Sequence, residues 1–181
     1  MSTPAVRARK ARGSDAGQVQ AYLVALGSNR PHPLHGGPDR VIGAAVAALR
    51  EAGLAIVALS PTIRSTPIGP SRRRFANAAL IAHTDLAPEA MLDLLQQTER
   101  TFGRCRRGQR WGARVLDLDI VLWSGGRFVS SRLVIPHPAF RTRAFVLGPA
   151  ARIAPSWRDP ATGLTLRQLN ARLTRPRAAS R

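Results

Sequence analysis

The chain has little of several residue types that usually reveal the class of a protein. Its 181 residues include a single cysteine, Cys105, so no internal disulfide can form, and this suits a reducing cytoplasm. No apolar run approaches the length that a membrane-spanning helix needs. Aromatic residues make up only 5% of the chain, which disfavours the base-stacking sheets of many RNA-binding modules. Acidic residues are also scarce, with 10 against 28 basic ones.

The abundant residues are arginine and small apolar residues. The net charge is +18, and Lys10 is the only lysine. Such a charge favours anionic partners, either nucleic acid or phosphorylated small molecules, although GC-rich coding also enriches arginine. Hydrophobic residues make up 44% of the chain, which excludes wholesale disorder. We expect one domain over residues 20–170, flanked by disordered basic tails at 1–19 and 171–181 that show no apolar periodicity.

Between the tails, strand and helix periods alternate. Strands are predicted at 21–26, 54–64, 75–83 and 115–123. One helix is predicted between an Asp39 cap and Gly53, and a second between a Thr84 or Asp85 cap and Arg100. The order β-α-β-β-α-β predicts a ferredoxin-like α+β sandwich, with an antiparallel sheet and helices on one face. The proline-rich segment 128–157 is expected to pack on the open face as loops and short helices.

Asp117 and Asp119 stand two residues apart in the apolar run 115–123. Residues i and i+2 of a strand face the same side, so the two carboxylates share one face, and their Cα atoms are about 6.6 Å apart at about 3.3 Å of rise per residue. Like charges this close repel each other, and a Mg²⁺ ion with phosphate oxygens relieves the repulsion. The alternative is a pair of solvated acids that form salt bridges with nearby arginines.

Five arginines precede the two acids. Guanidinium groups bind phosphate oxygens in a bidentate geometry that lysine cannot reproduce, so carboxylates beside arginines indicate a metal–nucleotide site. A solvated basic loop is the alternative for these side chains. The five residues are Arg104, Arg106, Arg107, Arg110 and Arg114.

His137 stands between two prolines, which suits either a ligand held at a fixed angle or a side chain that caps backbone groups. Arg141 and Arg143 follow closely and are candidates for the same phosphate cluster, and Arg132 is a weaker one. Taken alone, Phe145 is typical of a core residue.

Phe75 and Asn77 lie two apart on the predicted strand 75–83, so a ring and an amide share one face. A ring stacks on the plane of a heterocycle, and an amide binds its edge through paired donor and acceptor bonds. The alternative is a core phenylalanine beside an asparagine that bridges backbone groups. Glu99, at a helix C-terminus before the arginines, is most simply an ion-pair partner.

These motifs occur together in the order and spacing of one known family. The chain resembles the 6-hydroxymethyl-7,8-dihydropterin pyrophosphokinase family of folate biosynthesis over residues 20–155. The run Arg-Trp-Gly-x-Arg-x-Leu-Asp-Leu-Asp is its most specific part, and further matches lie at 22–29, 75–79, 135–138 and 143–147. The resemblance implies a ferredoxin-like cytoplasmic enzyme that transfers pyrophosphate from ATP to the pterin hydroxymethyl group, releases AMP and uses two Mg²⁺ ions.

Carried over residue by residue, the resemblance implies a role for each matching position. The metal ligands are Asp117 and Asp119. The ATP phosphates contact Arg104, Arg114, His137 and Arg143, while the nucleoside lies near Glu99 and the backbone at Ile120. The loop that closes over the reactants contains Arg106, Arg110 and Trp111. The pterin pocket contains Ser65, Ile68, Phe75, Asn77 and Phe145, with the two rings on either side of the pterin.

The chain also departs from the family pattern. Ala113 stands where members often carry proline. The loop before Phe75 contains Arg72, Arg73 and Arg74, where relatives are polar or acidic. The loop 30–38 is rich in proline and histidine, and its two histidines, at 32 and 35, are expected to be solvated. None of these positions is an implied metal or pterin residue.

Two other hypotheses fit parts of the sequence. A nucleic-acid-binding module is compatible with the charge and with a ferredoxin-like sheet, but no strand carries the aromatic-rich stacking run of RNA-recognition domains. An inactive paralogue is disfavoured because all the implied ligands are present. Small molecules are therefore the expected partners, rather than a specific nucleic acid or a membrane.

Overall fold

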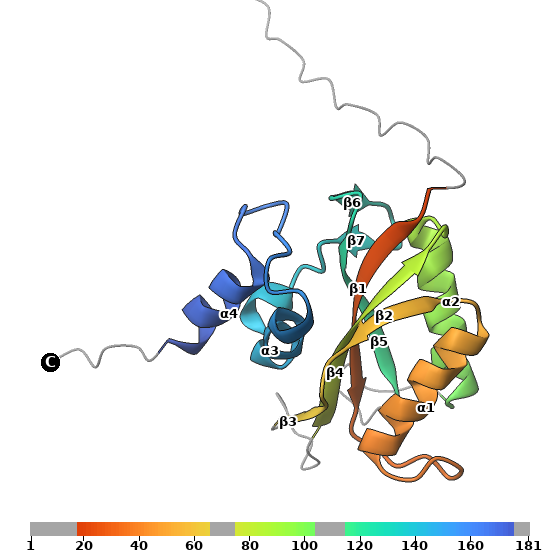
Figure 1. The fold of residues 1–181 in the computed structure, drawn as a ribbon. Helices are drawn as coiled ribbons and strands as arrows, with labels where there is room; N and C mark the ends of the chain where they lie inside the picture. Colours follow the sequence, from red (N-terminus) through yellow and green to blue (C-terminus); the bar gives the residue numbers. More distant parts are fainter. Residues whose placement is uncertain (1–17, 66–74, 104–114, 176–181) are drawn as a thin grey trace, which may run out of the picture.

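Figure 1 shows the computed structural model, in which residues 18–65, 75–103 and 115–175 are described. The strands are β1 (Gln20–Ser28), β2 (Ala55–Leu59), β3 (Ile63–Ser65), β4 (Phe75–Thr84), β5 (Asp117–Trp123), β6 (Phe128–Val129) and β7 (Val134–Ile135). The helices are α1 (Pro38–Glu51), α2 (Pro88–Thr101), α3 (Ala144–Ile153) and α4 (Leu166–Thr174), with a 3-10 turn, η1, at Phe140–Thr142. No helix within these ranges is long and apolar enough to cross a membrane.

Strand β1 lies inside an antiparallel sheet of order β2-β4-β1-β5, and β3 pairs with the first part of β4. β1 extends beyond the predicted range 21–26 because Gly27 and Ser28 continue the pairing with β4. Gly27 stands opposite Asn77 of β4 and Asp117 of β5. Directly opposite residues project from the same face of an antiparallel sheet. The amide and the carboxylate therefore flank a residue that has no side chain.

The predicted strand 54–64 is divided into β2 and β3. The strand is interrupted at residues 60–62, where Pro61 cannot donate to the ladder with β4. The buried Ser60 hydroxyl accepts a hydrogen bond of 2.9 Å from the Ala79 amide of β4 and so replaces a backbone partner at the break. A register shift between Ile56 and Ala58 further bends β2 at the sheet edge.

Helices α1 and α2 cover one face of the sheet (Figure 1). The caps differ from those predicted, because each helix begins at a proline whose fixed φ suits the first turn. The N-cap residues are Gly37 and Ala87, and neither makes a side-chain capping bond. Asp39 instead lies inside the first turn of α1 and pairs with Arg64 at 3.1 Å. The residues buried along α1 have the predicted helical spacing: Val41, Ile42, Ala45, Val46 and Leu49.

The histidines before α1 are not solvated as expected. His32 and His35 are partly buried, and their ring centroids lie 4.6 Å apart in a stacked arrangement. The His35 ring also stacks on Phe102, which follows α2, with centroids 5.0 Å apart. The small loop that carries them closes through two 2.8 Å backbone hydrogen bonds between His32 and Gly36. This loop therefore packs against the end of α2.

Helices α3 and α4 form a second layer on the other face of the sheet (Figure 1). This confirms that the open face is covered, although the covering segment contains a regular helix of 10 residues and a β6–β7 hairpin rather than only loops and short helices. α4 continues to Thr174, beyond the predicted start of the tail at 171. Its side chains Leu166 and Leu169 are buried, and Thr165 and Gln168 form a capping box.

A buried ion pair fastens this layer to η1. Asp159 has no exposed surface and accepts two hydrogen bonds, of 2.8 and 2.7 Å, from the Arg141 guanidinium. Burial alone raises the pKa of Asp159, but hydrogen bonds from Arg141, Thr162 and the Ala161 amide outweigh it and lower that pKa from 3.8 to about 2. The carboxylate is therefore ionised in the folded protein and stabilises it.

This pair predicts a defined pH dependence of stability. Because the folded pKa lies below the unfolded one, the contribution of Asp159 is complete above about pH 4 and disappears as the pH falls towards about 2; the shift corresponds to about 2 kcal/mol. Asp159→Asn should lower the free energy of unfolding at neutral pH by about 2–4 kcal/mol, because Arg141 loses its partner. Urea unfolding between pH 2 and 7 measures both effects.

The control is Asp39→Asn, which breaks the exposed pair with Arg64 and should cost less than about 1 kcal/mol. Equal pH slopes for the wild-type protein and Asp159→Asn below about pH 4 would show that Asp159 is not the titrating group.

Candidate active site

The two acids at the start of β5 share one face of the sheet, as predicted. Along β5, Asp117 and Asp119 alternate with the buried side chains of Leu118 and Ile120. Asp119 stands opposite Ala25 of β1, which packs against the core cluster under α3. The carboxylates therefore project towards the α3 side, and 43% of the Asp119 side chain is exposed. Carboxylate oxygens are the donor type that Mg²⁺ prefers, so the chemistry of this pair fits that ion.

Glu99 supports the backbone between the two acids. It lies in the last turn of α2, is only 3% exposed, and its Oε1 accepts a 2.8 Å hydrogen bond from the Leu118 amide. The sequence indicates an ion-pair partner at this position, and the structure adds a contact with the strand backbone. A charged acceptor makes this bond stronger than a neutral one. Glu99 therefore links the end of α2 to the strand that carries the carboxylates.

His137 makes the local capping contact that was one of the two alternatives left open by the sequence. Its Nδ1 accepts a 3.1 Å hydrogen bond from the Ala139 amide, which is a local cap. A neutral imidazole that accepts at Nδ1 carries its proton on Nε2. That Nε2 lies 4.0 Å from Oδ2 of Asp119. A 3.0 Å bond from the His137 amide to the Val121 carbonyl fixes this segment beside β5. His137 therefore directs an N–H towards the acid pair.

Arg141 and Arg143, which lie in and directly after η1, make different contacts. Arg141 is a sequence candidate for the phosphate cluster, but its guanidinium forms the bidentate bonds to Asp159, so the structure gives it a structural contact instead. Arg143 is the N-cap residue of α3, and its guanidinium lies 5.9 Å from the centre of the Phe145 ring in the first turn. Of these two side chains, Arg143 alone therefore adjoins another candidate site residue.

Three of the candidates for a heterocycle pocket lie on β3 and β4. Ser65 stands opposite Phe75, and the Asn77 amide nitrogen donates a 2.9 Å hydrogen bond to the Ser65 hydroxyl. Asn77 is 4% exposed, so this bond fixes the orientation of its amide. Helix α3, which carries Phe145, contacts both β3 and β4. The structure therefore brings these four residues to the same face of the sheet, with Asn77 separated from Asp117 by Gly27.

A cavity of about 320 Å³ opens beside Asp119, between β5, α2 and the β6–β7 hairpin. Arg132 of the hairpin turn borders it and pairs with Asp93 of α2, and this hydrogen bond lowers the pKa of the Asp93 carboxyl. The sequence contains the signal of this hairpin, two short apolar runs separated by a four-residue turn, although the hairpin was not predicted. Lining residues that sequence reasoning missed are Leu92, Ser130, Ser131, Leu133 and Val134.

The remaining candidates lie outside the described residues. They comprise all the arginines of the predicted loop, its tryptophan and one residue of the pterin pocket. These residues are Arg104, Arg106, Arg107, Arg110, Trp111, Arg114 and Ile68.

An antiparallel sheet with helices on both faces defines a mixed α/β protein, and paired carboxylates lie beside an amide at one end of its central strands. Residues 23–155 match the sequence model of 7,8-dihydro-6-hydroxymethylpterin-pyrophosphokinase. The chain belongs to this family.

Curated relatives carry the name 2-amino-4-hydroxy-6-hydroxymethyldihydropteridine pyrophosphokinase. The relative from Synechocystis sp. is 36% identical over 152 residues, which cover 84% of this chain and 75% of the relative. The relative from Pseudomonas aeruginosa is 41% identical over 143 residues, covering 78% and 85%.

The fold is also similar to a solved structure. The crystal structure of Plasmodium falciparum HPPK-DHPS superimposes with a TM-score of 0.68 at 12% identity over 88% of this chain. The chain spans 45% of the length of that protein. At this identity the likeness concerns the fold alone.

The Glu99 contact predicts a stability effect at the site. In Glu99→Ala, the buried Leu118 amide loses its acceptor, so the free energy of unfolding should fall by about 1–3 kcal/mol. Urea denaturation measures this change. Gln97→Ala, an exposed position on the same helix, is the control and should change stability by less than about 0.5 kcal/mol. Similar effects of the two variants would contradict the link between α2 and β5.

Proposed function

We propose that this protein transfers a pyrophosphoryl group from ATP to the hydroxymethyl group of 6-hydroxymethyl-7,8-dihydropterin and releases AMP, a step of folate biosynthesis. The observation that carries the proposal is the arrangement around Gly27, where the Asp117 carboxylate and the Asn77 amide project from one face of the sheet. It supports the proposal because a carboxylate suited to a cation and an amide suited to the edge of a heterocycle lie beside each other. The relatives' names support the same reaction.

In the transfer, the pterin hydroxyl oxygen forms a bond to the β-phosphorus of ATP. The bond from that phosphorus to the bridging oxygen of AMP breaks, and the hydroxyl proton goes to phosphate or water. Such reactions depend on positioning and on charge neutralisation more than on covalent groups of the protein. We therefore assign the described residues to binding and orientation, and none of them to general-base catalysis.

Two Mg²⁺ ions are part of the proposal, with Asp117 and Asp119 as their protein ligands. When bound, Mg²⁺ neutralises phosphate oxygens and stabilises the charge that develops during transfer. The two carboxylates project together from β5, and Glu99 supports the backbone between them. His137 and Arg143 are proposed to contact the ATP phosphates, because the His137 N–H is directed towards Asp119 and Arg143 lies at the start of α3.

The nucleoside of ATP is proposed to enter the cavity beside Asp119 and the backbone of Ile120. Its mixed lining suits a ribose and a base: Leu92 and Leu133 are apolar, while Ser130 provides a hydroxyl. Glu99 lies behind this strand and supports its backbone. Arg104, Arg106, Arg110, Trp111 and Arg114 complete the phosphate cluster and the closing loop in this proposal, on the strength of the sequence resemblance alone.

The pterin is proposed to lie across Asn77. The amide nitrogen already donates one hydrogen bond to Ser65, so its orientation is set, and the amide oxygen lies 3.6 Å from the position that a Cβ of Gly27 would occupy. Phe75 and Phe145 are proposed to stack on the two faces of the ring, with Ile68 completing the pocket.

The finer fold assignment also belongs to this proposal. Counting β2 and β3 as one divided strand, the order of elements is β-α-β-β-α-β, and the antiparallel order β2-β4-β1-β5 supports a ferredoxin-like topology. A cytoplasmic location is proposed with it, in keeping with a single cysteine.

The metal assignment predicts that Asp117→Asn and Asp119→Asn each reduce pterin-dependent AMP formation by at least about a hundredfold, since phosphate charge is then left without its counter-ion. The melting temperature should remain close to that of the wild-type protein. Turnover at varied Mg²⁺ concentration measures the loss, and Asp39→Asn on α1 is the matched acid-to-amide control. Normal turnover in either β5 variant would remove the metal role.

The amide assignment predicts selective loss of pterin affinity. Asn77→Ala should weaken binding of the dihydropterin by about tenfold or more, and Ser65→Ala by about fivefold, because each hydrogen bond contributes about 1 kcal/mol. Titration calorimetry with the pterin and with a non-hydrolysable ATP analogue measures both affinities. Thr84→Ala, at the other end of β4, is the control. Equal losses for the two ligands would count against an edge-binding amide.

A further inference from the structure

Charge is distributed unevenly between the two helix layers. Helices α1 and α2 carry three arginines and five acidic residues, whereas residues 144–175 carry five arginines and one acidic residue. That acid is Asp159, which is fully buried and paired with Arg141. The layer of α3, α4 and their connection therefore presents cationic groups with no exposed acid among its described residues.

Three of these arginines lie on α4 or directly at its end. The buried residues Leu166 and Leu169 define the inner side of this helix. At about 100° of rotation per residue, Arg167 lies about 130° and Arg172 about 90° from the middle of the inner side, and Arg175 is the C-cap residue. All three are exposed. The exposed surface of α4 is therefore cationic along its length.

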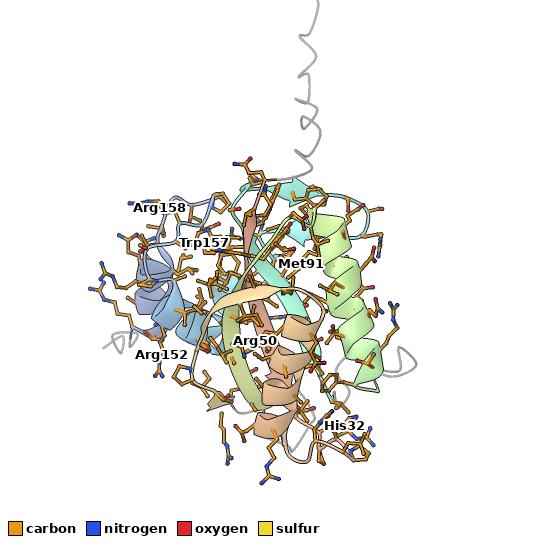
Figure 2. All side chains as sticks on the ribbon, turned by 45° about the vertical axis from the view of Figure 1, so that its right-hand side comes forward. His32, Arg50, Met91, Arg152, Trp157 and Arg158 are labelled. Carbon is orange, nitrogen blue, oxygen red and sulfur yellow. The ribbon has the colours of Figure 1, made fainter. Side chains whose placement is uncertain are left out.

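The other two arginines extend this surface towards α3. Arg152 lies in the last turn of α3, and Arg158 lies in the connection to α4. Both are exposed, and Figure 2 shows them on the α3 and α4 side of the molecule, whereas Arg50 lies on α1. We call the set formed by Arg152, Arg158, Arg167, Arg172 and Arg175 the arginine face.

We propose that the arginine face binds the phosphate backbone of nucleic acid independently of base sequence. Guanidinium groups bind phosphate in a bidentate manner, and a polyanion contacts several of them at once. Protein interfaces and membrane-binding surfaces need apolar anchors as well. Among the described residues of this layer, Leu173 is the one large hydrophobic side chain classed as exposed, at 37%. Phosphate is therefore the best match.

The arginine face is separate from the candidate active site. Arg143 and Phe145 lie at the start of α3 and Arg152 near its end, about 13 Å from Arg143 and about 10 Å from Phe145 along the helix axis at about 1.5 Å per residue. None of the five arginines belongs to the proposed ATP or pterin contacts. Removing them should therefore leave pyrophosphoryl transfer unchanged, which distinguishes this proposal from the proposed reaction.

The test measures binding of the full chain to a fluorescently labelled single-stranded RNA at several salt concentrations. The face variant carries Arg152→Gln, Arg167→Gln and Arg172→Gln. The control variant carries Arg40→Gln, Arg50→Gln and Arg100→Gln on the acid-balanced layer, so both variants have the same net charge. AMP formation is measured for each variant to show that it is folded and active.

The proposal predicts that the slope of log K against log salt concentration falls by about 2 in the face variant, because each phosphate contact with a single strand contributes about 0.7. Binding at low salt should weaken by about tenfold or more. The control variant should keep the wild-type slope, and ATP should not displace the RNA.

Several outcomes would overturn the proposal. Equal loss in both variants would mean that net charge acts without a defined surface, and an unchanged face variant would place RNA binding elsewhere on the chain. Displacement by ATP would assign the RNA to the active site. Equal competition by polyglutamate would indicate an acidic protein partner, and stronger capture by anionic phosphatidylserine vesicles would indicate a membrane.

Discussion

The antiparallel register of β1 between β4 and β5 is the constraint on which the candidate site depends. It places Gly27 opposite both Asn77 and Asp117, which are 40 positions apart in sequence. A shift of one residue would turn either side chain to the opposite face and into the core beneath α1 and α2. The apolar residues of β1 that face this core therefore also set the position of the polar groups on the other face. Folding of the sheet and assembly of the site are one event.

Asp159 and Asp119 differ in their surroundings, and this difference separates a structural carboxylate from a candidate site residue. Asp159 is fully buried, and its oxygens are occupied by Arg141, Thr162 and a backbone amide, so it has no capacity left for a ligand. Asp119 lies on a strand face, with 43% of its side chain exposed and His137 at 4.0 Å. Exposure lowers the free-energy cost of holding two carboxylates close together. The same residue type is thus a buried structural group in one layer and a partly exposed group on the strand face in another.

Local sequence patterns predicted those features that depend on periodicity. The i, i+2 spacing of 75/77 and 117/119, and the buried stripe of α1, follow from strand and helix geometry. The helix caps were wrong because a proline in the first turn, rather than a side-chain acceptor, sets both starts. α4 was not predicted because its arginines interrupt the apolar pattern, in which only two leucines are buried. Those two leucines become buried only when α3 packs against them. Register and layer packing are tertiary, so the pairing of Ser65 with Asn77 and the cavity at the hairpin could not be read from periodicity.

The high positive charge acts over two different distances. At physiological ionic strength the Debye length is about 8 Å, so Arg152, about 13 Å along α3 from Arg143, has little effect on the field at the start of that helix. The distant arginines act on ligands that approach from solvent, because a long polyanion can span several of them while a single nucleotide cannot. Arginine content alone therefore does not define one function for this chain, since its effect depends on which layer carries the charge and on whether an acid lies beside it.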